Sequence, residues 1–499
     1  MQTRSHVFAL SAGLLLFANV AGSQEDLYRL TEIGTLDGSP TSPAVINPKG
    51  HVAGTAIIND KSVAFLWTGD EVRNLGSFGG TFTEVLDMNA ARHVVGHSEN
   101  AGGSTHAFHW NRSELTDLGT LGGDNSSAES INGSGQITGR ADLSNMDFHA
   151  FFWDGSTLQD IGTLGGPSSY GIAINNNGHI TGQSETSDGA LHAFLWNGQE
   201  MQDLGTLGGD FSAPYAINSS SQIAGMSETA DGEQHAFLWD GTQMMDLGTL
   251  GGANSQVLAM NSLGNTTGTA QSVRGVYRAF FWDGTEMRGL GTLAGRKTVG
   301  LAINDSAQVI GTADLTLGRQ RPFYSNSGKL MVDIDEIIDP SDPLQACVTI
   351  THASDINNRG QIAATGDNLC SDYTGGYLLT PLQYQVEFIG PATGSQWRRS
   401  DFIPVKIALN DRTGNRIADA RAASLVVEPC RVKFSAEGAQ GRSPVCMKYN
   451  ATTNEFYFNW SPGVNAAIGT TNLVGSATYK FSMPERITTA KSRAITITQ

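Results

Sequence analysis

Charged residues are scarce in this chain, and one sign dominates. Asp, Glu, Lys and Arg make up 16% of its 499 residues, and 48 acidic against 31 basic residues give a formal net charge of −17. A surplus of negative charge opposes binding to a polyanion or to an anionic membrane surface. We therefore expect no nucleic-acid partner and no membrane insertion.

Long hydrophobic runs are also missing, except at the N-terminus. The apolar run 7–20 follows Arg4 and is followed by small residues, and it is too short to span a bilayer. This pattern is typical of a secretory signal peptide. We predict a signal peptide over residues 1–23, with cleavage after Ser23 or alternatively after Gly22, and a secreted protein that is extracellular or periplasmic.

Cysteine is rare, with four residues in the whole chain. An exported chain meets an oxidising compartment, so disulfides are expected, and four cysteines allow three pairings. The pairing that keeps each bridge inside one domain is Cys347 with Cys370 and Cys430 with Cys446. No CxxC motif is present, and we expect neither a metal site nor a cofactor.

Glycine, in contrast, is abundant at 60 residues, and much of it belongs to a repeat. The motif LGTLGG recurs every 43 residues, with successive members at Gly162, Gly205, Gly248 and Gly291. Six of the eight tryptophans keep the same interval: Trp67, Trp110, Trp153, Trp196, Trp239 and Trp282.

Each repeat predicts four short strands. The first ends in Ile-Asn or Met-Asn, the second is a β-branched run such as QIAG, the third is HAFLW or a relative, and the fourth leads into LGTLGG. Alternating apolar residues and NNG or DG turns are typical of antiparallel hairpins. Four strands in a period of 40 to 45 residues indicate a β-propeller blade.

The number of blades follows from the two ends of the repeat array. Sets of the first three strands occur eight times, and the last set ends near Leu379 without a fourth strand. A fourth strand without its partners, Leu27 to Thr35, precedes the first set. We therefore predict an all-β, eight-bladed propeller over residues 24–381 closed by its N-terminal strand, with seven blades as the alternative.

The pattern changes after residue 381. Alternating runs such as Pro404 to Leu409 and Glu455 to Trp460 are separated by turn-rich segments. For residues 382–499 we predict an immunoglobulin-like β-sandwich.

The motifs LGTLGG, AINxxG and HAFLW at this spacing resemble the HAF-repeat family of probable exported bacterial proteins. The tripeptide of that name stands here as His106-Ala107-Phe108, His149-Ala150-Phe151, His192-Ala193-Phe194 and His235-Ala236-Phe237. The first repeat departs from it with Val63 and the sixth with Arg278. The resemblance implies export and a repeat architecture, but no established activity.

The recurrent histidine does not predict a catalytic centre. Four equivalent residues on four blades stand too far apart for one site, so we expect each to form a hydrogen bond within its own blade, with the Trp and Phe of HAFLW as core. No GxSxG motif is present. Repeats three to five are nearly interchangeable, which disfavours a single asymmetric site.

Loops offer a better candidate for binding. The connections before the first strand and after the second strand of each repeat emerge on one face, vary from blade to blade, and carry carboxylates. We predict ligand-binding residues among them at Asp124, Glu185, Asp188, Asp210, Glu228 and Asp231.

The function predicted from the sequence is a monomeric binding or interaction module at or outside the cell envelope. The sequence does not identify its ligand, and an extracellular glycan or an extracellular protein are the two classes considered. Two alternatives remain open at this point. One is a secreted carbohydrate-active enzyme of the glycoside hydrolase or lyase type, and the other is a purely structural surface protein.

Overall fold

The computed structural model describes residues 27–382, apart from 316–318 and 372, together with separate strands before and after this range. Contacts divide the chain into two units. The larger comprises residues 30–338 and 344–380, and the smaller comprises 1–29, 339–343 and 381–499.

Within residues 27–382, the described chain forms eight antiparallel four-stranded sheets, in which the strands follow one another from the centre outwards. A single parallel pairing, Leu191 with Phe211, joins the fourth of them to the fifth. The innermost strands are β4 (Ser39–Ile46), β8 (Gly79–Met88), β12 (Gly122–Ile131), β16 (Gly165–Ile174), β20 (Gly208–Ile217), β24 (Gly251–Met260), β28 (Thr298–Ile303) and β32 (Val348–Ile356). The second strands are β5 (Val52–Ile58), β9 (Val94–Asn100), β13 (Ile137–Leu143), β17 (Ile180–Thr186), β21 (Ile223–Thr229), β25 (Thr266–Ser272), β29 (Gln308–Asp314) and β33 (Ile362–Asn368).

The third and fourth strands complete each sheet. The third strands are β6 (Lys61–Trp67), β10 (Thr105–Trp110), β14 (Phe148–Trp153), β18 (Leu191–Trp196), β22 (Gln234–Trp239), β26 (Tyr277–Trp282), β30 (Gln320–Asn326) and β34 (Tyr373–Pro381). The outermost are β7 (Val72–Gly76), β11 (Leu115–Asp117), β15 (Leu158–Asp160), β19 (Met201–Asp203), β23 (Met244–Asp246), β27 (Met287–Gly289), β31 (Val332–Asp333) and β2 (Tyr28–Glu32). A short strand, β3 (Thr35–Leu36), extends the first sheet, and the 3-10 helix η2 (Ile334–Ile337) follows β31.

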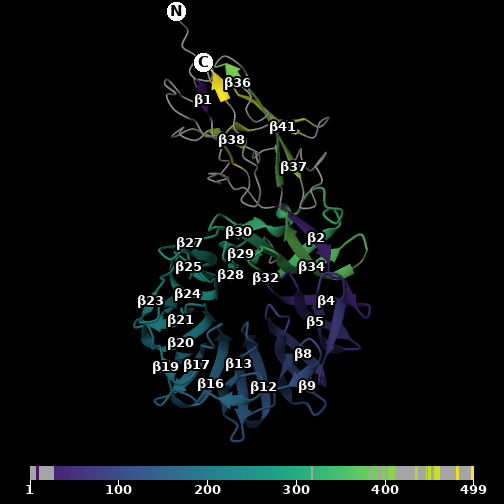
Figure 1. Cartoon of the computed structure of the whole chain (residues 1–499). Coiled ribbons are helices and arrows are strands. Elements are labelled where there is room, and N and C mark those ends of the chain that lie inside the picture. Colours follow the sequence, from purple (N-terminus) through teal and green to yellow (C-terminus); the bar gives the residue numbers. More distant parts are fainter. Residues whose placement is uncertain are drawn as a thin grey trace, which may run out of the picture. The chain divides into compact units, whose positions relative to one another are not determined.

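The sheets are arranged in a ring (Figure 1), because each innermost strand contacts the next one and β32 contacts β4. The last sheet has the order β2-β34-β33-β32, so its outermost strand comes from the N-terminal side of the chain. The Ile33 amide donates to the Gly376 carbonyl at 2.9 Å beside this junction. The all-β propeller class predicted from the repeat is therefore confirmed.

The repeat motif is divided differently from the sequence prediction. The fourth strand ends at the aspartate before LGT, for example at Asp203. The next innermost strand begins at the first glycine of the closing GG pair, for example at Gly208. Between these points the chain turns at Gly205 (φ 69°) and Gly208 (φ 114°), conformations that only glycine adopts without strain. The first four residues of LGTLGG thus connect one sheet to the next, and its GG pair begins the next innermost strand.

The core lies between neighbouring sheets. One cluster joins Leu66 on the third strand of the first sheet with Phe108 and Trp110 on the third strand of the second sheet. The phenylalanine of each HAFLW-type segment from Phe65 to Phe280 is fully buried. The predicted core role of these aromatic residues is confirmed.

The asparagine that ends each innermost strand links one sheet to the next. Asn132, for example, donates from Nδ2 to the carbonyl of Asn175 at 3.0 Å, while its Oδ1 accepts the amides of Ser134 and Gln136, both at 3.0 Å. The same inter-sheet bond is made by Asn47, Asn89, Asn175, Asn261, Asn304 and Asn357, the last of which donates to the carbonyl of Asn47. We call these residues and Asn218 the asparagine ring.

The closing sheet carries a disulfide between Cys347 and Cys370, with a Cα–Cα distance of 5.4 Å. Cys347 directly precedes β32 and Cys370 follows β33, so the bridge ties the innermost hairpin of this sheet together, as predicted. The other predicted pair cannot be judged, since Cys430 lies outside the described residues.

The smaller unit contains described strands at the predicted runs, among them β37 (Ile403–Asn410), β41 (Glu455–Trp460) and β43 (Thr496–Thr498). They belong to three sheets, β35-β37-β41-β40, β39-β38-β42 and β1-β43-β36. The other strands are β1 (Val7–Ala9), β35 (Gln385–Gly390), β36 (Gln396–Arg398), β38 (Lys433–Ala436), β39 (Val445–Cys446), β40 (Lys448–Asn450) and β42 (Tyr479–Ser482). The immunoglobulin-like arrangement and the signal peptide stay predictions. In the described part of the chain, no helix has the length and apolar character needed to cross a membrane.

Candidate functional site

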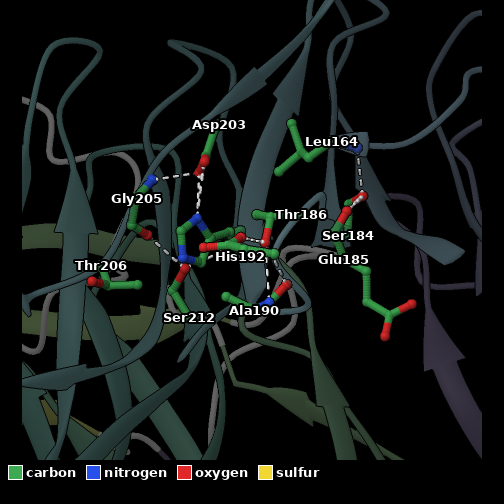
Figure 2. Close-up of polar contacts among 12 residues, drawn as sticks. Leu164, Ser184, Glu185, Thr186, Ala190, His192, Asp203, Gly205, Thr206 and Ser212 are labelled. Atoms are coloured by element: carbon green, nitrogen blue, oxygen red, sulfur yellow. Dashed lines mark hydrogen bonds and ion pairs between the residues drawn. The ribbon is translucent and has the colours of Figure 1, made fainter. Parts of the chain in front are cut away.

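The four HAF histidines form hydrogen bonds with aspartates of their own sheets. His192 Nδ1 lies 2.9 Å from Asp203 on the neighbouring outermost strand, and Asp203 in turn accepts the Gly205 amide at 2.7 Å. Figure 2 shows Asp203 between these two partners. The equivalent pairs are His106–Asp117, His149–Asp160 and His235–Asp246.

A serine continues each of these arrangements toward the core. Ser212 Oγ donates to the Gly205 carbonyl at 2.7 Å and accepts the Ala193 amide at 2.8 Å. The histidine, aspartate and serine therefore fix the LGTLGG turn to its sheet. The prediction that each histidine bonds within its own blade is confirmed, and the arrangement is structural.

The predicted ligand-binding carboxylates lie elsewhere than expected. Asp124, Asp210, Glu185 and Glu228 were predicted in loops, and this was wrong, because they belong to β12, β20, β17 and β21. In these sheets, each innermost strand begins at a glycine that pairs with the last residue of the second strand. The sheet therefore includes segments whose polar residues suggest a loop when only the sequence is read. Asp188 and Asp231 do lie in turns.

These carboxylates do not converge on one centre. Glu228 Oε2 accepts the amide of Asp210 at 3.0 Å, which joins two of them within the fifth repeat. Asp188 accepts the Thr186 hydroxyl at 2.5 Å, and this bond lowers the pKa of Asp188. Glu185 is directed away from the His192–Asp203 pair (Figure 2). Each carboxylate is occupied locally or faces solvent, so the set shows no common site.

A different group of side chains does converge, on the inner strands of the second, third and fourth sheets. Glu84 and His97 face each other across β8 and β9, and His97 Nε2 lies 3.4 Å from Glu84 Oε2. His97 Nδ1 lies 3.0 Å from Ser127 Oγ on β12. Ser127 in turn donates to Glu129 Oε1 at 2.6 Å.

The cluster extends into the fourth sheet. Burial raises the pKa of Tyr170 on β16, and the nearby Glu129 carboxylate adds to this shift. The Arg140 guanidinium lies over the Tyr170 ring, 5.5 Å from its centroid. We call Glu84, His97, Ser127, Glu129, Arg140 and Tyr170 the inner cluster.

An aromatic ring borders the inner cluster. Phe82 lies two residues before Glu84 on β8, its ring centroid is 5.5 Å from that of His97, and 46% of the residue is exposed. Glu84 is also open to solvent, with 49% of its side chain exposed. A solvent-facing ring beside hydrogen-bonding groups is a feature of ligand sites.

Burial determines the protonation states of the inner cluster. Burial lowers the pKa of His97, and the positive charge of Arg140 lowers it further. The negative charges of Glu84 and Glu129 raise this pKa but do not outweigh burial. Burial also raises the pKa of Tyr170, and Glu129 adds to this effect. At neutral pH the imidazole and the phenol are both uncharged, while both kinds of group stay available as hydrogen-bond partners.

Sequence reasoning missed the inner cluster, although the repeat contains a signal for it. The positions of Glu84, Ser127 and Tyr170 are equivalent in successive repeats, and the following three repeats carry Ala213, Gln256 and Val299 there. The ionisable or hydroxyl side chains at this position are thus replaced by an amide or by apolar residues in the following three repeats. Whether repetition disfavours a single asymmetric site stays a prediction.

No family model matches the chain, and no curated protein sequence matches it. Among solved structures, the β-propeller domain of the trilobed protease from Pyrococcus furiosus is similar at 13% identity and a TM-score of 0.39, covering 64% of this chain and all of that one. The BP39L lectin from Burkholderia pseudomallei is similar at 8% identity and a TM-score of 0.34, covering 62% of this chain and 98% of that one. Neither likeness bears on function.

Two partly buried carboxylates each bridge successive sheets. Asp355 on β32 accepts the amide of Ile46 on β4 at 3.0 Å, and Asp87 on β8 accepts the amide of Ile131 on β12 at 2.9 Å. Burial raises the pKa of Asp355 to about 6, and the negative charge of Asp87 adds to the shift. In the described part of the chain, no group of three His, Cys, Asp or Glu residues is placed to hold a metal ion.

The raised pKa of Asp355 predicts a stability that depends on pH. Its value is about 4 in an unfolded chain, so the folded state binds this proton more tightly. The resulting stabilisation is complete below about pH 4 and is lost as the pH rises through about 6, with a maximum of about 3 kcal/mol. Asp355→Asn removes this dependence while keeping an oxygen for the Ile46 amide.

Denaturant unfolding of the two proteins at several pH values measures this effect. Between about pH 4.5 and 7.5, the wild type is expected to lose about 2 kcal/mol more of its unfolding free energy than Asp355→Asn. Asp124→Asn, at an exposed aspartate, is the control and should keep the slope of the wild type. Parallel slopes for the wild type and Asp355→Asn would contradict the assignment.

Proposed function

We propose that this protein is an exported, HAF-type propeller that binds a glycan at the inner cluster. The observation that carries the proposal is the row of contacts from Glu84 through His97 and Ser127 to Glu129, bordered by the exposed ring of Phe82. Carboxylates, an imidazole and a guanidinium recognise hydroxyl groups, and an aromatic ring packs against the apolar face of a sugar. Export is supported by the disulfide between Cys347 and Cys370.

Glycan-array binding with the full chain tests the proposal. Once a ligand is found, Phe82→Ala and Glu84→Gln are each expected to weaken its affinity about tenfold, the usual effect of losing one aromatic contact or one charge-assisted hydrogen bond. Titration calorimetry measures the change.

Matched controls distinguish the inner cluster from the carboxylates predicted in the sequence. Phe211→Ala makes the same substitution at the position equivalent to Phe82 in the fifth repeat. Glu228→Gln neutralises one of the carboxylates that the sequence analysis predicted to bind a ligand. Both should bind as the wild type does. If Glu228→Gln weakens binding and Glu84→Gln does not, the inner cluster is not the site.

An enzymatic function is the second candidate, because two carboxylates flank the imidazole of His97: Glu84 lies 3.4 Å from Nε2, and Glu129 is linked to Nδ1 through Ser127. Glycoside hydrolysis uses a pair of carboxyl groups. Incubation of the bound glycan separates the two functions. An enzyme releases products and loses turnover in Glu129→Gln, whereas a binding protein leaves the glycan intact.

A further inference from the structure

The hydrogen-bond directions in the inner cluster can be assigned from the acceptors. Glu129 is a carboxylate and only accepts, so the Ser127 hydroxyl hydrogen points to it at 2.6 Å. Ser127 Oγ must then accept from His97, which places the imidazole hydrogen on Nδ1. The other ring nitrogen, Nε2, is left with a lone pair.

That lone pair faces a second acceptor. His97 Nε2 lies 3.4 Å from Glu84 Oε2, and no hydrogen bond joins the two atoms among the described residues. The Glu84 side chain is 49% exposed and that of His97 is 17% exposed. Two acceptors side by side, one of them open to solvent, create a place for a group that only donates hydrogen bonds.

The surrounding charge selects the kind of donor. Glu84 and Glu129 contribute two negative charges, and Arg140, which lies over Tyr170 and Phe148, contributes one positive charge. With His97 uncharged, the inner cluster has a net negative charge, which favours a cation. A primary ammonium has three donors and no acceptor, and so fits two facing acceptors.

Phe82 adds the second part of the specificity. It precedes Glu84 by two residues on the same strand, so the two side chains point to the same face about 7 Å apart. This spacing suits a sugar ring packed on Phe82 with a substituent that reaches Glu84. We propose that the Glu84–His97 pair binds the primary ammonium of an amino sugar whose ring packs on Phe82.

This inference rests on the proposed glycan site and names its ligand class. Titration calorimetry in weakly acidic buffer compares three tetrasaccharides that differ in one substituent: the chitosan tetramer with free amines, the chitin tetramer with acetamides, and cellotetraose with hydroxyls. Putrescine provides an amine without a sugar ring. We expect the chitosan tetramer to bind about tenfold more tightly than each of the other three probes.

Two variants separate a specific contact from general attraction to an acidic protein. Glu84→Gln and Glu228→Gln change the net charge by the same amount, so non-specific binding of a cation falls equally in both. We expect Glu84→Gln to remove the tenfold preference for the amine and Glu228→Gln to keep it. Phe82→Ala should weaken the chitosan tetramer about tenfold and leave putrescine unchanged.

Several results would overturn the inference. The first two are equal affinity for the amine and acetamide tetramers, and putrescine binding as tightly as the chitosan tetramer. The others are an equal loss of chitosan affinity in Glu84→Gln and Glu228→Gln, or no binding of the chitosan tetramer at all. The proposed function fails separately, when no array glycan depends on Phe82 and Glu84. If the binding of a neutral glycan depends on Phe82 and Glu84, the glycan site is supported and the proposed ammonium specificity is wrong.

Discussion

Replacing Asn132 with alanine is expected to destabilise the propeller by about 3 kcal/mol, because several buried groups lose their partners together. Its Nδ2 donates to the Asn175 carbonyl and to Gln136 Oε1, and its Oδ1 accepts two amides of its own turn. Asn132 is 3% exposed, so water replaces few of these bonds. Denaturant unfolding, or the melting temperature where unfolding is irreversible, measures the loss.

Two further variants define the cause. Asn132→Asp keeps the oxygen that accepts the turn amides but sets a carboxylate against the Asn175 carbonyl, so it should cost at least as much as alanine. Asn197→Ala removes an exposed turn asparagine whose Oδ1 accepts two amides, and it should cost about 1 kcal/mol or less. If Asn132→Ala and Asn197→Ala cost the same, the inter-sheet bond contributes little.

The asparagine ring illustrates which features the sequence could reveal. The Ile-Asn pair was recognised as the end of a strand, because its position in the 43-residue period is a local property. Its inter-sheet bond was not predicted, since the acceptor is the backbone carbonyl of the next repeat and carries no residue-specific signal. The propeller fold could be predicted from periodicity, but the hydrogen bonds between successive sheets could not.

The inner cluster was missed for a related reason. The pairing of Glu84 with His97 depends on a register shift between Val85 and Asp87, which moves every pair beyond it by one residue. The contact of His97 with Ser127 then crosses from one sheet to the next. Alternating patterns in the sequence do not show such irregularities.

The opposite error affected the predicted site. Glu185 and Glu228 were assigned to loops because polar residues surround them, yet both pair with the third strands at the ends of β17 and β21. Polarity at these positions reflects solvent exposure of a sheet end, not the absence of a strand. A carboxylate in a repeated polar segment is therefore weak evidence for a binding loop.

The strand that closes the ring provides the second large effect. Deleting residues 24–32 removes β2, including Tyr28 and Leu30, which are 0% and 5% exposed, and leaves β34 as an unpaired edge. We expect a loss of about 5 kcal/mol, from the two buried side chains and the hydrogen bonds of one strand. An exposed edge also pairs with other chains, so oligomers should appear in size-exclusion chromatography.

A shorter deletion serves as the control for this experiment. Removing residues 24–26 shortens the same segment without touching β2, so its melting temperature and elution volume should match those of the wild type. Cooperative unfolding should be lost only with the longer deletion, because the last sheet then lacks its outer strand while the other seven keep theirs. If the protein lacking residues 24–32 melts as the wild type does and stays monomeric, the N-terminal strand does not hold the ring closed.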